Sequence, residues 1–571
     1  MKPPDVITLL QEKGVSLVSE GNDLVVRAPR GAMSSELLAW IRSHKQGLIA
    51  ELEISGSNVT VDAPLTITPD LLSLITLTQS QIDHIVNSVP HGAANVQDIY
   101  PLAPLQEGIL FHHLLETERD PYLLRTILAF DSRSRLDTFV AALQMVIDRH
   151  DALRTAVLWQ ELPQPVQVVY RHARLPVEEL APPTEGGVLE HLLGHTDPHH
   201  TRLDVQHAPL LAATMVYDPD TDEWLLAIRF HHLAIDHITL KLILAEVRAV
   251  LLGQADSLPQ ALPYRNFVAH TLVVSTADHE AYFRRQLGDV DQPTAPFDQL
   301  DVYGDGDRVG AARLPLSPEL AERIRRNARQ QGVSAAVLFH LAWAQVLAQC
   351  SGRDDVVFGT VLFGRMQGLV GTDLVAAGMF VNTLPLRVPL AQVSVREAIA
   401  GTHQGLSQLL VHEQASLALA QRCSAVPASM PLFTALLNYR DNRPTLTDAA
   451  AALAWDGMRV LAVEERTNYP ITMSVEDWGE GFGLSAQCTR GIDPQRLVAY
   501  LVTAIEGLIG AMERQPHRLV LSLNILPPAE RQRLLIEFND TATDYARDRL
   551  IHELFEAQAE ARPGAIAVSY E

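Results

Sequence analysis

The sequence predicts an α/β protein with a body of two lobes and a small N-terminal unit built as helix, hairpin and helices. From Tyr100 to about Ile525, apolar runs of strand length alternate with helix-like stretches such as 136–149 and 334–349. This body is longer than one hydrophobic core, which stops growing near roughly 250 to 300 residues. The first residues follow a separate pattern.

The N-terminal unit is predicted over residues 1–55. Apolar residues between 6 and 10 form one helical face, and two strand-like runs at 15–18 and 24–27 flank a turn-rich segment. The apolar residues between 37 and 52 suit one or two further helices. A unit of this size is marginally stable alone and gains stability by docking.

The body begins after a linker at 56–75. A capping box at Thr78 to Gln81 opens a short helix. We assign 76–268 to the first lobe and 269–525 to the second, because a cleft between two lobes is a common place for a substrate to bind. No internal sequence repeat relates the two.

Composition disfavours several classes of function. The formal charge of −23 disfavours nucleic acid and anionic membranes as partners. Cys350, Cys423 and Cys488 are odd in number and lack metal-type spacing, which predicts reduced thiols. No run approaches the roughly 18 uninterrupted apolar residues of a membrane span, and an export signal is not recognisable. We therefore expect a cytoplasmic protein.

The most informative stretch runs from His231 to His237, where a doubled histidine is followed by an aspartate and a third histidine. It lies between a strand-like run at 224–230 and a helical pattern at 238–252. Because successive strand residues point to opposite faces, we assign His231 to the scaffold and His232 to a cavity. The alternative is a pair of ordinary histidines capping a surface strand.

A second doubled histidine, His112 and His113, is followed by Asp120. Adjacent histidines on a helix do not share a face, and neither pair has the His-Glu-x-x-His spacing of a helical zinc site. No metal site is therefore predicted. The alternative is that this pair only packs in a helical turn after Phe111.

Five motifs occur in an order that resembles the condensation domain of nonribosomal peptide synthetases. They are the segments 101–108, 149–155, 231–236, 378–383 and 467–470. Each is weak alone, and together they are strong. The resemblance implies a V-shaped pair of chloramphenicol-acetyltransferase-like lobes, with a tunnel that reaches the histidine motif from both faces.

The resemblance also implies peptide-bond formation between two thioesters. Phosphopantetheine arms of upstream and downstream peptidyl carrier domains would present these substrates, and no cofactor would be bound to the chain itself. His232 would act as general base or hydrogen-bond partner of the attacking amine, supported by His231, Asp236 and His237. The family usually has glycine where His237 stands, so His237 would line the donor channel or act as a bulky gate.

Three further residues take roles from the same resemblance. A buried, ionised Asp236 needs a partner, and Arg154 is expected to pair with it as structural support. The alternative for Arg154 is a solvated arginine at a helix end. Asn382 in the latch motif and Asn468 in the last motif would line the substrate channel.

The stretch from His112 to Asp120 resembles the extra signature of the dual epimerisation/condensation subclass, with Arg119 where glycine is usual. This implies that the upstream residue is inverted at Cα before condensation. His232 would be the shared base, and His113 and Asp120 would shape the donor side. The alternatives are condensation without epimerisation, a stand-alone epimerase, a coenzyme-A-dependent acyltransferase, and a noncatalytic carrier-docking module.

The two ends of the chain carry resemblances of their own. The N-terminal unit is similar to docking domains of the tubulysin type, in which a hairpin edge receives the C-terminal segment of the preceding subunit. Arg27, Arg30 and Lys45 would select an acidic segment, and a generic cap on the next domain is the alternative. Residues 526–571 are similar to a linker and the opening of an adenylation domain. This predicts a piece of a longer subunit, although a terminal amphipathic helix is the simpler reading.

Overall fold

The N-terminal hairpin is confirmed. In the computed structural model, β1 (Ser16–Glu20) pairs antiparallel with β2 (Asp23–Arg27), placing Ser16 opposite Arg27. The helices predicted within 1–55 and the first half of the linker, residues 56–65, lie outside the described residues. The structure describes these two strands and the ranges 66–116, 119–300, 310–364, 375–442, 455–464, 469–544 and 547–570.

The first lobe is built on a five-stranded sheet with the order β14-β4-β9-β8-β7. Even-numbered residues of β4, such as Leu128, pack with helices α6 and α8, whereas odd-numbered ones, such as Ile127, pack with α7. This alternation buries both faces of the sheet. The elements are β4 (Leu123–Phe130), α6 (Arg133–Arg149), β7 (Val177–Leu180), α7 (Val188–His195), β8 (Leu211–Asp218), β9 (Glu223–His231), α8 (His237–Leu251) and β14 (Met458–Glu464).

A smaller three-stranded sheet, β3-β6-β5, completes this lobe. Helix α4 begins at the predicted capping box, in which Thr78 and Gln81 bond each other's backbone, and it buries Ile82 and Ile85 against this sheet. The elements are α4 (Gln79–Ser88), β3 (Val96–Pro101), α5 (Pro104–Leu115), the 3-10 turn η3 (Asp151–Arg154), β5 (Thr155–Leu158) and β6 (Val166–Tyr170).

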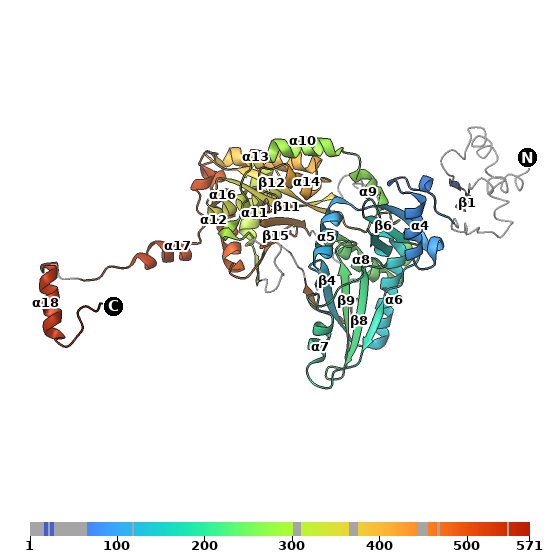
Figure 1. The fold of residues 1–571 in the computed structure, drawn as a ribbon, viewed down its shortest axis with the longest axis horizontal. Helices are drawn as coiled ribbons and strands as arrows, with labels where there is room; N and C mark the ends of the chain where they lie inside the picture. The colour runs from blue at the N-terminus through green and yellow to red at the C-terminus, as the bar shows by residue number, and fades with distance from the viewer. Residues whose placement is uncertain are drawn as a thin grey trace, which may run out of the picture.

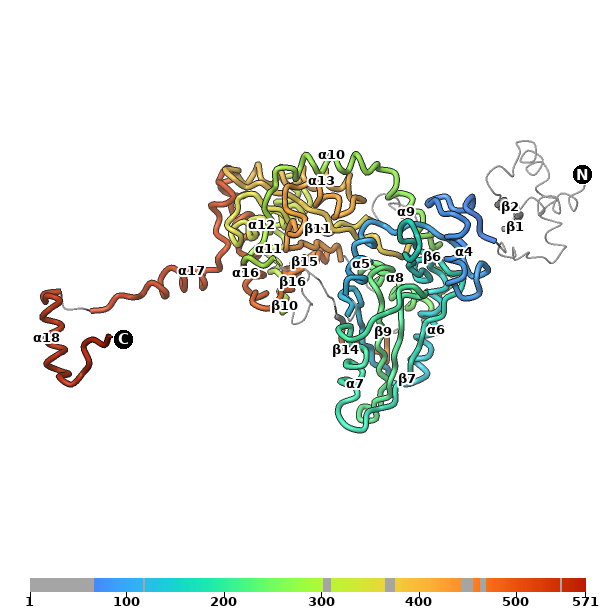
Figure 2. The backbone as a smooth tube through the Cα atoms, in the orientation of Figure 1, coloured from blue at the N-terminus to red at the C-terminus, as the bar shows by residue number. Residues whose placement is uncertain are grey.

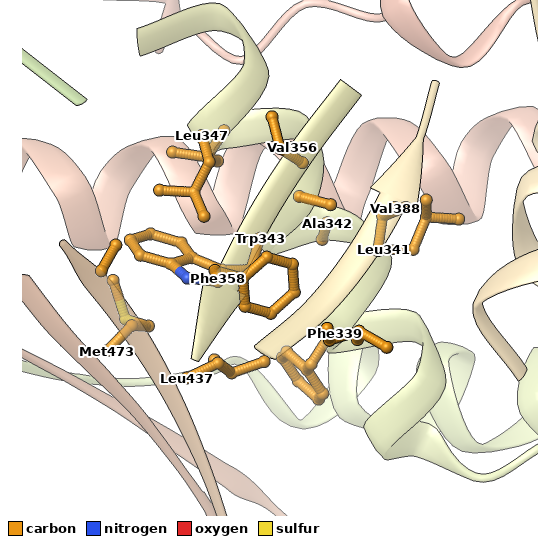
Figure 3. Packing of buried hydrophobic residues seen from close by; sticks show 14 of the residues in the cluster. Phe339, Leu341, Ala342, Trp343, Leu347, Val356, Phe358, Val388, Leu437 and Met473 are labelled. Carbon is orange, nitrogen blue, oxygen red and sulfur yellow. The ribbon is translucent and has the colours of Figure 1, made fainter. Parts of the chain in front are cut away.

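The second lobe contains a six-stranded sheet with the order β10-β16-β15-β13-β11-β12. Its core is one continuous apolar cluster around Trp343, Phe339 and Phe358 (Figure 3). The strands are β10 (Gly310–Pro315), β11 (Asp355–Phe363), β12 (Val381–Pro389), β13 (Ala435–Asp441), β15 (Ile471–Asp477) and β16 (Phe482–Cys488). The helices are α10 (Thr276–Leu287), α11 (Pro318–Gln331), α12 (Ala335–Ser351), α13 (Val395–Val411), α14 (Leu417–Arg422) and α16 (Pro494–Arg514). Helix α9 (Arg265–Thr271) joins the two lobes and contacts β3 of the first.

The boundary at residue 268 does not separate the two lobes completely. Strand β14 lies within 269–525, yet it pairs antiparallel with β4 of the first lobe, with Met458 opposite Phe130 (Figure 2). This crossover covers an edge of the first sheet that would otherwise expose unpaired backbone groups. The second part of the chain thus contributes directly to the lobe that carries both histidine pairs.

The C-terminal residues extend away from the body. Helices α17 (Pro528–Leu535) and α18 (Ile551–Ala561) lie on an arm that leaves the second lobe (Figure 1). Within the described residues, α16 is long and apolar enough to span a membrane, as is the bent pair α11 and α12 taken as one, with its 106° bend. In α16 the apolar residues serve the lobe's core, where Leu501 and Leu508 are fully buried.

Candidate active site

The motif from His231 to His237 lies at the predicted junction between strand and helix. Strand β9 ends at His231, and α8 begins at His237 with Asp236 as its N-cap. His231 is completely buried and His232 is half-buried. The two rings therefore have the different exposures expected of neighbours on opposite faces of a strand.

The hydrogen bonds of His232 define its tautomer. Its backbone N–H donates to Tyr122 O at 3.0 Å, and its Nδ1 lies 2.9 Å from Ile235 O. A carbonyl oxygen only accepts, so Nδ1 carries the hydrogen and Nε2 carries the lone pair. This is the arrangement that a histidine base requires.

The second histidine pair meets the first at a single carboxylate. Asp120 Oδ2 lies 2.6 Å from His113 Nδ1 and 2.9 Å from His231 Nε2, and all three side chains are buried. Asp120 Oδ1 also accepts from Tyr122 N at 3.0 Å. Burial alone would raise the pKa of Asp120, but the potential and hydrogen bonds of the two imidazoles outweigh it and hold this pKa well below its usual range.

The same three side chains have the composition of a metal site. Their ligand atoms all lie within 4.8 Å of one another. Asp120 is an acceptor, however, so His113 Nδ1 and His231 Nε2 both carry hydrogens toward it. Each nitrogen would have to lose its hydrogen before it could bind a metal ion. The distances fit a hydrogen-bonded cluster in which neither imidazole has to lose a hydrogen.

Asp236 connects the motif to the second lobe. Its Oδ1 accepts from Thr239 N at 2.6 Å, and its Oδ2 accepts from Phe380 N at 3.0 Å. Thr239 Oγ1 donates to Gly378 O at 2.6 Å. Gly378 has φ +151°, and a Cβ there would lie 2.2 Å from the ring of Tyr264, so only glycine fits. The start of α8 thus anchors the segment 378–380.

The expected pairing of Arg154 with Asp236 is wrong. Arg154 Nη1 donates to Gln97 Oε1 at 2.9 Å, to Arg171 O at 3.0 Å, and to Tyr170 O. Arg154 ends the η3 turn and faces the end of β6, while backbone N–H groups serve Asp236. Burial lowers the pKa of Arg154, and its structural support goes to the three-stranded sheet.

Of the two asparagines predicted to line the channel, the structure describes Asn382 and leaves Asn468 outside the described residues. Asn382 is buried in β12, and its Nδ2 donates to Glu413 O and Ala415 O, both at 2.7 Å. Its amide thereby holds the chain that follows α13. Asn468, Arg30 and Lys45 lie outside the described residues, and Arg27 is described only as part of strand β2.

The remaining predicted residues border this site. His112 is half-buried, with its ring centroid 5.9 Å from that of Tyr122, and burial lowers its pKa, which favours the neutral imidazole. Neither His237 nor Arg119 has positive φ. The backbone therefore accepts a side chain at both positions where the family usually has glycine.

Sequence reasoning missed Tyr122, Thr239 and Arg202. Thr239 lies three residues after an N-cap aspartate, so the rules of helix capping could have found it. Tyr122 lies two residues beyond Asp120 and next to His232, with ring centroids 6.5 Å apart. Arg202 lies 89 residues from its partner His113, and no sequence pattern joins them.

Comparisons with known proteins show the family and the fold of this chain. Residues 96–535 match the family model of the condensation domain, and residues 5–53 match that of the TubC N-terminal docking domain. A four-domain nonribosomal peptide synthetase bound to AMP and glycine has a similar fold, with a TM-score of 0.62 at 14% identity over 82% of this chain and 37% of that chain. The predicted α/β fold is confirmed.

The chain belongs to the condensation-domain family, and its first residues to the TubC-type docking domains. Malpinin synthetase of Mortierella alpina is 47% identical over 90% of this chain, and malpibaldin synthetase of the same organism is 43% identical over 90%. The chain spans only 7% and 9% of the length of these two proteins.

Proposed function

We propose that this chain joins carrier-bound aminoacyl or peptidyl thioesters in nonribosomal peptide synthesis, after inverting the upstream residue from L to D. The substrates arrive on phosphopantetheine arms of external upstream and downstream carrier domains. The longer subunit supplies an adenylation domain. Membership of the condensation-domain family supports the first half of this proposal, and the hydrogen-bonded cluster at Asp120 supports the second.

Condensation needs little chemistry from the protein. A thioester is already activated, and a free α-amine titrates near roughly 8. His232 Nε2 accepts a hydrogen bond from the attacking amine, takes its proton as the amide bond forms, and returns that proton to the departing thiolate, which leaves as the thiol. Such base catalysis contributes about 10² to 10⁴-fold, and positioning of the two arms contributes further.

Epimerisation makes a stronger demand on the same base. The proton on a Cα next to a thioester is far less acidic than an ammonium, so its removal depends more steeply on a well-placed imidazole. One carboxylate, Asp120, binds both His113 of the extra signature and His231 of the catalytic motif. This shared contact is the observation that carries the proposal, because it joins the signature directly to the residue preceding His232.

The test is the configuration of the condensed product. An upstream carrier is loaded with an L-residue and a downstream carrier with an acceptor, and the product is released and resolved by chiral chromatography. We expect the D-configured product, with a D-loaded donor as the matched control that gives the same product. Retention of L from the L-loaded donor would reduce the activity to ordinary condensation.

The docking domain extends the proposal to a partner. The C-terminal segment of an upstream subunit adds as a strand to the edge of the β1–β2 hairpin, and basic residues at Arg27, Arg30 and Lys45 favour an acidic segment. Deletion of residues 1–55 should weaken binding of this subunit and spare condensation at high carrier concentration. Unchanged affinity after the deletion would refute the docking role.

A further inference from the structure

Arg202 binds the end of helix α5 from a loop between α7 and β8. Its Nη1 donates to Glu116 O, and its Nη2 donates to His113 O at 2.5 Å. The same Nη2 lies 3.0 Å from His113 Nε2. Guanidinium nitrogens only donate hydrogen bonds, so His113 Nε2 is the acceptor in this contact.

This contact sets hydrogen positions along a chain of side chains. With Nε2 accepting, neutral His113 carries its hydrogen on Nδ1, which faces Asp120 Oδ2 at 2.6 Å. Asp120 receives a second hydrogen from His231 Nε2 at 2.9 Å. His231 Nδ1 then accepts from Leu233 N at 3.0 Å, in the turn that follows His232. One tautomer satisfies each ring.

We propose that Arg202 is a positioning residue that keeps His113 Nε2 unprotonated, so that His113 and Asp120 hold His231 and the turn that carries His232 in place. The inference concerns the same site as the proposed function, and its activity test rests on that function. Arg202 acts through His113 and Asp120, not on the substrate.

The charges in the cluster support this role. Asp120 is fully buried, and a buried carboxylate needs compensation from hydrogen bonds and nearby positive charge. Arg202 supplies a permanent charge on the far side of one imidazole. Arg202 also disfavours a metal ion in this cluster. The guanidinium would repel a cation bound between His113, Asp120 and His231, and that cation would have to displace the hydrogens on both imidazoles.

The direct test is where His113 carries hydrogen in the whole chain. Protein labelled with ¹⁵N-histidine is compared by NMR before and after Arg202→Met, and the His113 signals are assigned as those lost in His113→Gln. We expect hydrogen on Nδ1 alone in the wild type. In Arg202→Met, Nδ1 still donates to Asp120, and we expect Nε2 to take up a proton as well, because the guanidinium no longer donates to it. Arg202→Gln keeps a donor without the charge and should keep Nε2 unprotonated. An Nε2 that stays unprotonated in folded Arg202→Met would overturn the proposal.

Single-turnover condensation gives the second readout. Arg202→Met should lower the rate at saturating carriers by about tenfold to a hundredfold, with half-saturating carrier concentrations nearly unchanged, because a small misplacement of the base reduces the rate of the chemical step. Arg202→Lys should restore part of the rate, and Arg174→Met, at an exposed arginine, should match the wild type. Wild-type rates in Arg202→Met would contradict the proposal.

The two proposals fail in different ways. If wild-type protein retains L or forms no product, the proposed function fails, while the protonation of His113 Nε2 still tests Arg202. Stoichiometric zinc that survives dialysis of the purified wild type and is lost in His113→Gln would overturn the role of Arg202, because the imidazole nitrogens would then be metal ligands.

Discussion

The interiors of the two lobes differ in what they bury. Within the described residues, the buried Asp, Glu and Arg side chains of the first lobe are Asp120, Arg125, Asp151, Arg154, Asp236 and Glu246, whereas those of the second are Glu413 and Asp477. The second lobe instead has one continuous apolar core, while apolar residues of the first lobe fall into several smaller clusters. The lobe with the histidine pairs thus buries more charged side chains, and each of these needs hydrogen-bond partners.

In the proposed reaction, this difference gives each lobe a different part. Buried charges are costly unless they are paired, so they persist where a geometry must be specified. The first lobe uses them to orient His231 and His232. The second lobe contributes backbone hydrogen bonds to the start of α8, where Gly378 O accepts from Thr239 and Phe380 N donates to Asp236. The side chains of this segment pack outside the large core: Met379 joins the apolar cluster of the first lobe, and Phe380 joins a smaller cluster around Tyr264.

The seam between the lobes combines both kinds of contact. Tyr264 N donates to both carboxylate oxygens of Asp151, at 3.0 and 3.1 Å, and the Tyr264 hydroxyl donates to Met379 O. An apolar cluster surrounds these bonds, with Tyr100 and Val169 from one side and Phe380 from the other. These contacts hold the segment 378–380 of the second lobe against the first lobe, beside the start of α8.

The largest effect is expected in the apolar core. Trp343→Ala should lower the free energy of unfolding by about 4 kcal/mol, because it leaves a large cavity among Phe339, Phe358 and their neighbours. Urea unfolding measures this loss, with Trp478→Ala, 43% exposed, as a control that costs about 1 kcal/mol or less. Activity per folded molecule should be unchanged. A specific loss of activity would break the contrast between the lobes.

Asp120→Ala should affect stability and chemistry together. Removing the carboxylate leaves His113 and His231 without their shared partner, which costs about 3 kcal/mol. Because the folded state lowers this pKa, the contribution is present above the ordinary aspartate pKa, about 4, and is lost as the pH falls through the lowered value. Unfolding as a function of pH, with exposed Asp137→Ala as control, checks both statements. A difference that grows on acidification would contradict them.

His340 is a buried titratable group inside the apolar lobe. Burial lowers the pKa of His340 to about 4, and its Nε2 lies 2.7 Å from Thr360 Oγ1. A lowered histidine pKa means that the unfolded chain takes up the proton first, so stability falls as the pH drops below about 6.5. The wild type should lose about 2 kcal/mol between pH 7 and pH 5 from this residue. His340→Gln should flatten that slope, and an unaltered slope would exclude His340 as its source.

The sequence predicted the local features and missed the long-range ones. The strand-to-helix junction at His231 and the capping box at Thr78 follow from periodicity and capping rules, which act over a few residues. The pairing of β14 with β4 and the contact of Arg202 with His113 join segments far apart in the chain. Periodicity carries no information about such partners.

Arg154 shows why a buried charge cannot be paired from sequence alone. Asp236 needed compensation, and an arginine was the obvious candidate. The start of a helix offers backbone N–H groups to its N-cap, and Phe380 N offers another from the second lobe. Every residue except proline has a backbone N–H, so the sequence does not indicate which of them binds a buried carboxylate.

The most direct measurement is the single-turnover rate of product formation by His232→Ala with both carriers loaded. We expect a rate lower by about 10² to 10⁴-fold, with the inverted product reduced more than the condensed one, because His232 provides the base for both proposed steps. A wild-type rate and a wild-type ratio of D to L product would show that the half-buried imidazole at position 232 is not the base.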